Sequence, residues 1–271
     1  MGAWEPAHRS HPAGGRGGRL SAVPYTEHFF EVREAGSVSS ARRILPAVLA
    51  LTRASSVLDV GCGIGTWASV ALECGATEVT GVDGDWVALE ALAVAPDLFV
   101  SHDLCTPLDL GRGFDLALCL EVAEHLPAGA ADTLLSSLTR HAPAVLFSAA
   151  IPFQGGRHHV NEQWQSHWIG RFAELGFGVH DVVRPAVWTD PAVEPWYAQN
   201  TLLFIEHDRA AALGLDPEPP AQADVVHPGL HTIRHAQPAL KPSLQLLPRA
   251  VRTDSRRLRA AARSRLGGRR G

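Results

Sequence analysis

A buried strand, a glycine-rich turn and a helix are predicted in succession within residues 57–74, and this stretch limits the fold more than any other. Residues 57–60 are apolar apart from Asp59, which is the pattern of a strand buried in a parallel sheet. Three of the next five residues are glycines, and glycine lets a ligand approach the backbone N–H groups because it has no Cβ. A doubly wound α/β sheet builds a nucleotide-binding crevice in this way, at the carboxyl end of its first strand.

The spacing of the glycines distinguishes between nucleotide ligands. A dinucleotide-binding turn has the pattern G-x-G-x-x-G, whereas here Gly65 follows Gly61 and Gly63 one residue too early for that pattern. A second strand, predicted at 78–82, ends at Asp83, where a carboxylate can accept hydrogen bonds from ribose hydroxyls. In these features the chain resembles the class I S-adenosylmethionine-dependent methyltransferases. The alternatives are an NAD-binding Rossmann domain and a coincidental turn.

The resemblance implies S-adenosylmethionine as the cofactor and assigns its contacts. The turn and Asp59 would hold the methionine portion, Asp83 the ribose, and Asp103 the adenine amino group. Trp86 is expected to cover one face of the adenine, with an ordinary core aromatic as the alternative. The expected cofactor-binding residues are Tyr25, Asp59, Gly61, Cys62, Gly63, Gly65, Asp83, Gly84, Trp86, Asp103, Leu104 and Glu121.

The resemblance also implies the fold, a Rossmann-like α/β domain over residues 25–207. We expect a doubly wound, seven-stranded, mostly parallel sheet with helices on both faces and an antiparallel last strand. The expected strands are 57–60, 78–82, 98–101, 114–120, 144–149, 179–183 and 200–206. The expected helices are 25–35, 39–51, 66–74, 85–95, 128–141 and a helix through 169–175 that Asn161 caps, while 184–197 is expected to be a loop.

The catalytic base is expected near the transferable methyl group. Residues 120–126 resemble the family segment that lies beside this group, and they contain His125 with Glu121 and Glu124. Imidazole has an ordinary pKa of about 6.5 and is suited to removing a proton from a hydroxyl or an amine. The alternative is a buried, hydrogen-bonded histidine with a structural role.

Residues 157–168, after the fifth strand, are rich in His, Asn, Glu, Gln and Trp and have three interpretations. In the first, His158 or His159 is a general base, and Glu162 and its neighbours bind a polar acceptor. In the second, His158, His159 and Glu162 hold a divalent metal such as Mg²⁺ that chelates an acceptor diol. In the third, these residues only cap, pack or face solvent. We take His125, His158, His159 and Glu162 as the candidate catalytic residues and assign no metal ligand.

Composition bounds the rest of the interpretation. With 271 residues, 46% of them hydrophobic, the chain is expected to form one sizeable domain with extensions. The chain has no run of eighteen apolar residues, so we expect no membrane span, and residues 1–20 lack the apolar core of a secretory signal. Four cysteines without a CxxC pair favour reduced thiols and a cytoplasmic protein.

The flanking segments differ from the domain in composition. Residues 1–24 are glycine-rich and expected to be disordered, and residues 208–248 are expected to form a proline-rich linker or wrap. Residues 249–271 carry nine arginines and one acidic residue, although the whole chain has a net charge of −4. We expect no nucleic-acid partner for the acidic remainder, while the basic tail can contact an anionic partner or surface.

Together these features predict an S-adenosylmethionine-dependent methyltransferase. The polar composition of 157–168 favours a small or glycan-like acceptor, and we expect methylation on oxygen. The segment also resembles small bacterial methyltransferases of glycan and natural-product pathways, and this resemblance implies a role in secondary-metabolite or polysaccharide biosynthesis. Aminocarboxypropyl transfer from the same cofactor is one alternative. A non-catalytic cofactor-binding module is another, and the intact glycine turn with Asp59, Asp83 and Asp103 argues against it.

Overall fold

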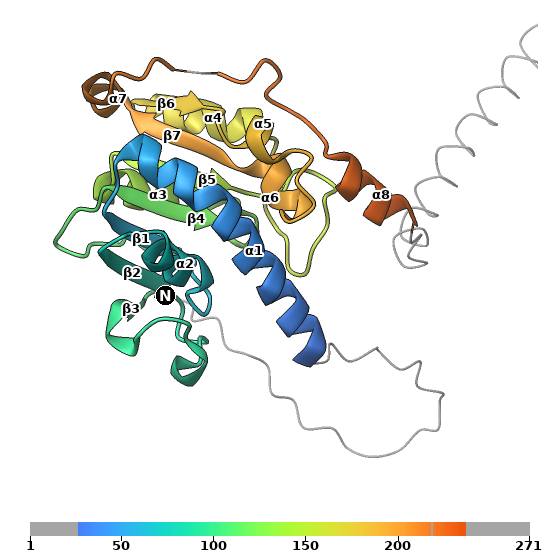
Figure 1. Ribbon diagram of the computed structural model, residues 1–271, viewed down its shortest axis with the longest axis horizontal. Helices are drawn as coiled ribbons and strands as arrows, with labels where there is room; N and C mark the ends of the chain where they lie inside the picture. Colours follow the sequence, from blue (N-terminus) through green and yellow to red (C-terminus); the bar gives the residue numbers. More distant parts are fainter. Residues whose placement is uncertain (1–26, 218, 237–271) are drawn as a thin grey trace, which may run out of the picture.

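A seven-stranded sheet runs through the computed structural model, which describes residues 27–217 and 219–236 (Figure 1). The strands are β1 (Ser56–Val60), β2 (Glu78–Asp83), β3 (Phe99–Ser101), β4 (Leu116–Leu120), β5 (Ala144–Ser148), β6 (Phe177–His180) and β7 (Leu202–Glu206). Their order is β3-β2-β1-β4-β5-β7-β6, and all are parallel except β7, which pairs antiparallel with both β5 and β6. The predicted Rossmann-like sheet with an antiparallel last strand is confirmed.

Alternate residues of the central strands enter two separate hydrophobic cores. On β4, Leu116 and Leu118 belong to one core and Ala117 and Cys119 to the other, because successive side chains of a strand point to opposite faces. The first core includes α1 (Glu27–Thr52), α2 (Thr66–Glu73), α5 (Arg184–Val187) and α6 (Pro195–Asn200), and the second includes α3 (Ala131–His141) and α4 (Gln165–Glu174). Helices therefore cover both faces of the sheet, and α1 crosses one of them (Figure 1).

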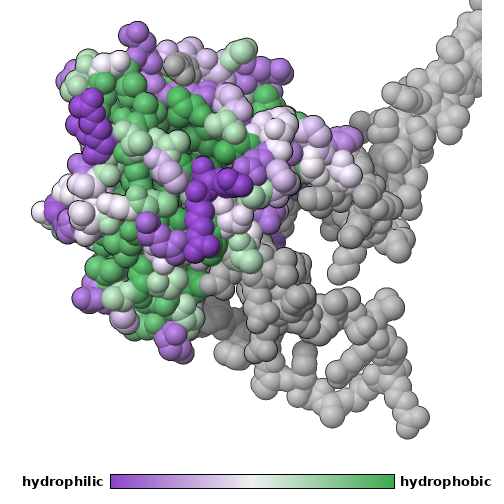
Figure 2. Space-filling view, viewed as in Figure 1, coloured by the Kyte–Doolittle hydropathy of each residue, from purple (hydrophilic) through white to green (hydrophobic). Residues whose placement is uncertain are grey.

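The surface over α1 mixes hydrophobic and hydrophilic residues (Figure 2). Arg42 of α1 forms an exposed ion pair with Glu73 of α2 at 2.9 Å, which joins the two helices on the solvent side. Solvent screens such a pair, so the buried apolar residues of α1 and α2 carry most of the attraction between them.

The topology leaves a crevice between β1 and β4. From β1 the chain adds β2 and β3 on one side and then returns to place β4 on the other side. Ligands of doubly wound sheets bind at such a switch point, outside the carboxyl ends of the strands. The turn after β1 and the segment after β4 therefore face the same crevice.

The two helices predicted at 25–35 and 39–51 are one continuous helix, α1, so that division was wrong. Gly36 lies inside the helix and does not end it, and its carbonyl oxygen also accepts a hydrogen bond from Ser40 Oγ at 2.8 Å. The side chain of Glu194 occupies the space that a Cβ on Gly36 would need. Gly36 is therefore explained by close packing rather than by a helix end. Tyr25, an expected cofactor neighbour, and residues 1–24 lie outside the described residues.

The helix predicted at 85–95 is also wrong. The segment contains only the short 3₁₀ turn η1 (Leu89–Ala91), and a second turn, η2 (Pro96–Leu98), follows it. Trp86 and Leu89 are 72% and 53% exposed, so the segment buries no continuous apolar face that would stabilise a helix. The N–H of Ala93 instead donates to the carbonyl of Ile64 at 2.7 Å and ties this segment to the glycine turn.

The chain after β5 stays a loop until α4 begins at Gln165, so Asn161 does not cap a helix. The N–H groups of Val160 and Asn161 both donate to the carbonyl of Glu124, at 2.8 and 3.0 Å. The side-chain amide of Asn161 donates to the carbonyl of Ala123 at 3.3 Å. These bonds hold the loop against the segment after β4 and compete with helix formation.

The segments predicted as loop and linker also contain helices. The expected loop at 184–197 includes α5 and the start of α6, and the described part of 208–248 includes most of α7 (His207–Leu213) and α8 (Pro228–Ala236). Arg184, which is 3% exposed, pairs with Asp181 at 2.7 Å and donates to the carbonyls of Gln222 and Ala223. The proline-rich segment is thus bound to the domain near residue 223. Among the described residues, no helix has the length and apolar character to cross a membrane.

Candidate active site

The glycine turn, residues 61–65, leaves β1 in a conformation that side chains disfavour. Gly61 has φ 77°, and a Cβ there would lie 2.3 Å from Val122 Cγ2, so the turn is packed closely against the segment after β4. Gly63 has φ 55°, and a Cβ there would meet no atom within 4 Å. The open side of Gly63 therefore gives a ligand room to approach the backbone. Burial raises the pKa of the Cys62 thiol, so Cys62 has no thiolate character in this turn.

Asp59 holds the turn to the helix that follows it. Its side chain is 4% exposed, and Oδ2 accepts a hydrogen bond from the N–H of Ala68 at 3.2 Å. Burial raises the pKa of Asp59 to about 7, and the negative charge of Asp83 contributes to the same shift. The carboxylate can ionise more readily when a cationic ligand group lies beside it.

Asp83, at the end of β2, is bound by backbone donors on both oxygens. Oδ2 accepts from the N–H of Gly63 and Oδ1 from the N–H of Gly84, each at 2.7 Å. Burial raises the pKa of Asp83, whereas these two hydrogen bonds lower it. An ionised carboxylate has about four acceptor positions, so two remain for ribose hydroxyls.

The expected adenine contacts lie at the ends of β2 and β3. The N–H of His102 donates to the carbonyl of Asp83 at 2.8 Å, which holds the two strand ends together. Asp103 is exposed and Leu104 is buried. Trp86 is exposed and its ring lies against Gly84, where a Cβ would collide with it. The alternative of an ordinary core aromatic is therefore wrong for Trp86.

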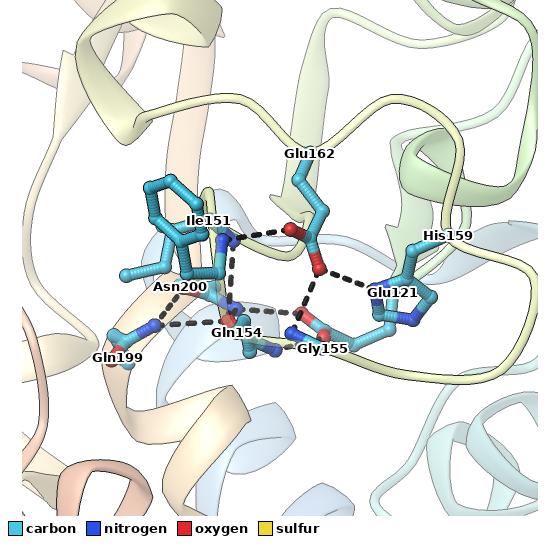
Figure 3. A network of polar contacts seen from close by, with 9 residues as sticks. Glu121, Ile151, Gln154, Gly155, His159, Glu162, Gln199 and Asn200 are labelled. Carbon is cyan, nitrogen blue, oxygen red and sulfur yellow. Dashed lines mark hydrogen bonds and ion pairs between the residues drawn. The ribbon is translucent and has the colours of Figure 1, made fainter. Parts of the chain in front are cut away.

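Glu121 follows β4 in a left-handed backbone conformation with φ 57°. Its N–H donates to the carbonyl of Ser148, and its carboxylate accepts from Asn200 Nδ2 at 3.1 Å and from Gln154 Nε2 at 3.2 Å (Figure 3). Burial raises the pKa of Glu121, and the hydrogen bonds from the amides lower it. Strained backbone at a non-glycine residue is common where a side chain is held for function.

Sequence reasoning missed the amides that hold Glu121. Gln154 accepts from both Gln199 Nε2 and Asn200 Nδ2 at 3.0 Å, so three amides form one network around a single carboxylate (Figure 3). The available signal was the pair of consecutive amides, Gln199 and Asn200, directly before an apolar strand. A buried strand start rarely carries two amides unless each has a partner.

Glu124 is the second carboxylate after β4 and lies in a different environment. It is 0% exposed, and neither of its oxygens accepts a hydrogen bond from the described residues. Burial raises the pKa of Glu124 well above its usual range, and the negative charge of Glu121 raises it further.

The histidines meet beside these carboxylates. The rings of His125 and His159 pack edge to face with their centres 4.8 Å apart. His159 Nδ1 lies 3.0 Å from Glu162 Oε1, and Glu162 also accepts the N–H groups of Phe153 and Gly155 at 2.8 Å each (Figure 3). We call the whole group the polar wall: Glu121, Glu124, His125, Gln154, His159, Glu162 and Asn200.

Three of the four candidate catalytic residues belong to the polar wall, and His158 does not. His158 is exposed with φ 63°. The metal interpretation of residues 157–168 joined His158 to Glu162, which can share a face only if the helix starts early, but both lie in the loop before α4. The loop turns the ring of His159 toward His125, whereas His158 lies outside the group formed by Glu124, His125 and His159.

The strand order, the glycine turn and the acidic residues after β1 and β2 define a Rossmann-like fold with a nucleotide-type crevice. The family model described as "Methyltransferase domain" matches residues 33–177, which is more than half of the chain. The chain therefore belongs to the methyltransferase domain family.

Individual relatives are distant. The ribosomal protein L11 methyltransferase of Laribacter hongkongensis is 35% identical over 102 residues, which are 36% of this chain and only about a third (34%) of the relative. The sugar N-methyltransferase KedS8 from Streptoalloteichus superposes with a TM-score of 0.52 at 16% identity, over 74% of this chain and 99% of the other. DesVI from Streptomyces venezuelae has a TM-score of 0.52 at 14% identity, over 69% and 99%. At these identities the two structures show a shared fold.

The residues of the crevice fit the cofactor. Gly63 offers open space beside exposed backbone, and Asp59 and Asp83 offer buried carboxylates for a ligand that carries a cationic sulfonium and a ribose. When bound, the cofactor would supply an activated methyl group. The chain would position this methyl group and the acceptor relative to each other.

Proposed function

We propose that this methyltransferase methylates an oxygen of a small or glycan-like polar acceptor. The polar wall carries the proposal, because it gathers carboxylates, amides and histidines at the crevice edge next to the glycine turn. Such groups pair with hydroxyls, which an apolar pocket would leave without partners. One fold neighbour, KedS8, is described as a sugar N-methyltransferase, which agrees with a polar, sugar-like acceptor.

In this proposal the expected cofactor residues keep their roles. Asp59 and the glycine turn hold the methionine portion, Asp83 binds the ribose, and Asp103 with the N–H of Leu104 binds the adenine. Trp86 covers one adenine face, which its exposed ring supports. Glu121 lies on the side of the transferable methyl group.

The reaction is an in-line displacement at the sulfonium methyl. A nucleophile held at about 3–3.5 Å gains most of its acceleration from position, and a base removes its proton before or during attack. His125 or His159 takes that proton, because each is an imidazole beside the carboxylates of the wall. Glu162 orients His159 through Nδ1.

The compartment and pathway belong to the same proposal. All four cysteines are free, which agrees with a cytoplasmic enzyme of secondary-metabolite or polysaccharide biosynthesis. The acidic domain with separate basic tail agrees with a small-molecule rather than a nucleic-acid substrate.

The first test is calorimetric titration of S-adenosylmethionine into the full chain and into Asp83→Ala. We expect micromolar binding that weakens at least about 10-fold, because hydrogen bonds to a charged group are worth about 1.5–3 kcal/mol. Asp97→Ala, an exposed carboxylate in η2, is the matched control and should bind like the wild type. Equal binding by Asp83→Ala would remove Asp83 from the cofactor site.

The second test offers acceptors in pairs that differ only in a hydroxyl or an amino group, among free sugars, nucleotide-linked sugars and phenols. We expect S-adenosylhomocysteine and an O-methylated product, identified by mass and by NMR. Methylation confined to the amino members would contradict the choice of oxygen. Transfer of an aminocarboxypropyl group, or cofactor binding without any product, would support the two alternatives instead.

A further inference from the structure

Three residues of the polar wall bring possible metal ligands together. One carboxylate oxygen of Glu124 and one ring nitrogen each of His125 and His159 lie within 4.8 Å of one another. Nitrogen and oxygen ligands bind a divalent ion at about 2.0–2.2 Å, so opposite ligands are about 4 Å apart. The three groups therefore need only small side-chain movements to share one ion, and no second group of this kind occurs among the residues that the structure describes.

Glu124 adds independent evidence, because its carboxylate is fully buried and has no partner at normal hydrogen-bond geometry; the groups that face it are the carboxyl of Glu121 and the backbone of Ala150. It is 0% exposed, and neither oxygen accepts a hydrogen bond from the described residues. A buried charged or polar group without a partner is costly, so such groups normally pair or coordinate metals. Both oxygens of Glu121 accept hydrogen bonds from amides, whereas Glu124 has no such donor. A cation would supply the partner that Glu124 lacks.

His159 has the arrangement of a supported metal ligand. Its Nδ1 interacts with Glu162 Oε1 at 3.0 Å, which fixes the ring, so an ion would bind the other nitrogen, Nε2, on the ring edge that packs over Gly156. Glu162 is itself held by the N–H groups of Phe153 and Gly155. A carboxylate, histidine and metal series of this kind is common where a protein orients its ligands.

We propose that Glu124, His125 and His159 bind one divalent transition-metal ion, such as Mn²⁺ or Zn²⁺, that holds the acceptor's hydroxyl groups beside the methyl donor. This differs from the metal interpretation of the sequence, because His158 and Glu162 are not ligands. Two imidazoles and a carboxylate favour a transition ion over Mg²⁺ or Ca²⁺, which prefer oxygen ligands. Three protein ligands leave open positions for oxygens of the acceptor.

The position of the group suits this role, which rests on the proposed function. Val122, two residues before Glu124, packs against Gly61 of the glycine turn, so the candidate ion site adjoins the cofactor site. An ion lowers the pKa of a bound hydroxyl and makes it a better nucleophile at neutral pH. With the ion bound, His125 and His159 are ligands rather than bases, and the proton of the hydroxyl passes to solvent. It also stabilises adjacent carboxylates that otherwise repel each other.

Binding is tested with the full chain, freed of metal with a chelator and dialysed, using Mn²⁺ and Zn²⁺ alone as probes. Calorimetry and Mn²⁺ electron paramagnetic resonance measure affinity and stoichiometry, and thermal unfolding measures the stabilisation. We expect one ion per chain and a raised Tm. Glu124→Gln and His159→Gln should each weaken binding at least about 100-fold, and Glu162→Gln about 10–100-fold. His158→Ala is the neighbouring control and should bind like the wild type.

The variant Glu124→Gln also reports on folding. It keeps the shape of the side chain and replaces a buried carboxyl group by an uncharged amide, so the metal-free variant should unfold at the same or a higher temperature than the metal-free wild type. A folded Glu124→Gln that binds Mn²⁺ as tightly as the wild type would overturn the site. So would a wild type that binds neither ion below millimolar concentration.

The role in transfer is separated from the proposed function by measuring three quantities on the same protein: ion binding, S-adenosylmethionine binding and product formation. Loss of transfer on chelation, with cofactor affinity unchanged and activity restored by the ion, supports the role. Transfer that continues without the ion overturns the role while leaving the proposed function in place. If no acceptor is methylated by the ion-loaded chain, the proposed function fails, and this assigned role fails with it.

Discussion

The glycine turn with Asp59 and Asp83 and the polar wall are two halves of one crevice that hold their carboxylates differently. In the first half, backbone N–H groups from nearby residues bind the carboxylates, as Gly63 and Gly84 do for Asp83. In the polar wall, amide side chains from distant segments bind Glu121, and Asn200 lies 79 residues from it in sequence, whereas Glu162 is bound by backbone N–H groups of its own loop. Glu124, in the same wall, has no such donor.

The two kinds of hydrogen-bond donor predict different tolerance to amino-acid substitution in the two halves. Backbone donors depend on the conformation of a short turn, so the cofactor half should fail when that conformation is lost. Side-chain donors can be removed one at a time, so the wall should lose acceptor handling in steps while the turn keeps binding the cofactor. Variants of the glycine turn and of the polar wall should therefore affect cofactor binding and acceptor handling separately.

Gly61→Ala should have the largest effect. A Cβ would lie 2.3 Å from Val122, and φ 77° disfavours any residue with a Cβ. The two costs together are about 2–4 kcal/mol, which should lower both stability and cofactor affinity. Chemical denaturation and calorimetric titration measure them. Gly113→Ala, where a Cβ would meet its nearest atom at 3.6 Å, is the control. A Gly61→Ala protein that binds the cofactor normally would show that the turn's conformation is not required.

Asn200→Ala should affect the wall without affecting the turn. It removes one donor from Glu121 and one from Gln154, and an unpaired buried acceptor costs about 1–3 kcal/mol. We expect lower stability and a lower kcat/KM for the acceptor, while the Kd for S-adenosylmethionine stays within about 2-fold, well below the cost of one such bond. Gln222→Ala, an exposed amide, is the control.

The variant Asn200→Ala can also contradict the assignment of Glu121 to the acceptor half. Glu121 is also an expected cofactor contact, so a cofactor affinity that falls as far as kcat/KM would place Glu121 in the cofactor half. Steady-state kinetics with each substrate varied in turn, beside calorimetry of the cofactor alone, distinguishes the two results.

Protonation of Asp59 should make cofactor binding depend on pH. Burial first, and the charge of Asp83 to a lesser extent, raise the pKa of Asp59 to about 7. The cationic sulfonium favours the ionised carboxylate, so affinity should rise about 10-fold between pH 6 and pH 8. Titrations at four pH values measure it, and Asp59→Asn should remove the dependence. An affinity that is equal at both pH values would contradict the role of Asp59.

The same pKa predicts the opposite trend for the stability of the cofactor-free protein. The unfolded chain loses this proton near the ordinary value of 3.8, whereas the folded chain keeps it to about 7. Between these values the folded state binds more protons, so the contribution of Asp59 to the free energy of unfolding falls as pH rises from about 4 to 7. Denaturation of the wild type and Asp59→Asn across this range isolates that contribution.

The sequence predicted the glycine turn after β1 and the acid at the end of β2 because their determinants are local, while the binding of the cofactor by these residues remains a prediction. Apolar strands, three glycines and an acid at a strand end lie within residues 57–83, and the sheet forces them to one edge. The fold, including the antiparallel β7, was predicted from the family resemblance that these residues carry. The domain boundaries at 25 and 207, and the role of the basic tail, remain predictions.

The polar wall was predicted only in part because it depends on long-range pairing. His125, His159 and Glu162 stood out by residue type, but a helical spacing placed His158 with Glu162, and the loop conformation that separates them depends on hydrogen bonds to Glu124. The amides of Gln154 and Asn200 have no local pattern that links them to Glu121. The burial of Glu124 likewise depends on the tertiary fold.

Trp86→Ala should have the smallest effect and tests the outer edge of the cofactor half. The ring is 72% exposed, so its loss should change the free energy of unfolding by no more than about 0.5 kcal/mol. If the ring covers the adenine, stacking worth about 0.5–1.5 kcal/mol should be lost, and the Kd for S-adenosylmethionine should rise about 2- to 10-fold. Trp86→Phe should keep most of the affinity, whereas the ribose contact at Asp83 should be unaffected in either variant. Equal affinity for wild type and Trp86→Ala would leave the adenine to Asp103 and the N–H of Leu104, and the proposed cofactor contacts would then be made by backbone groups and carboxylates.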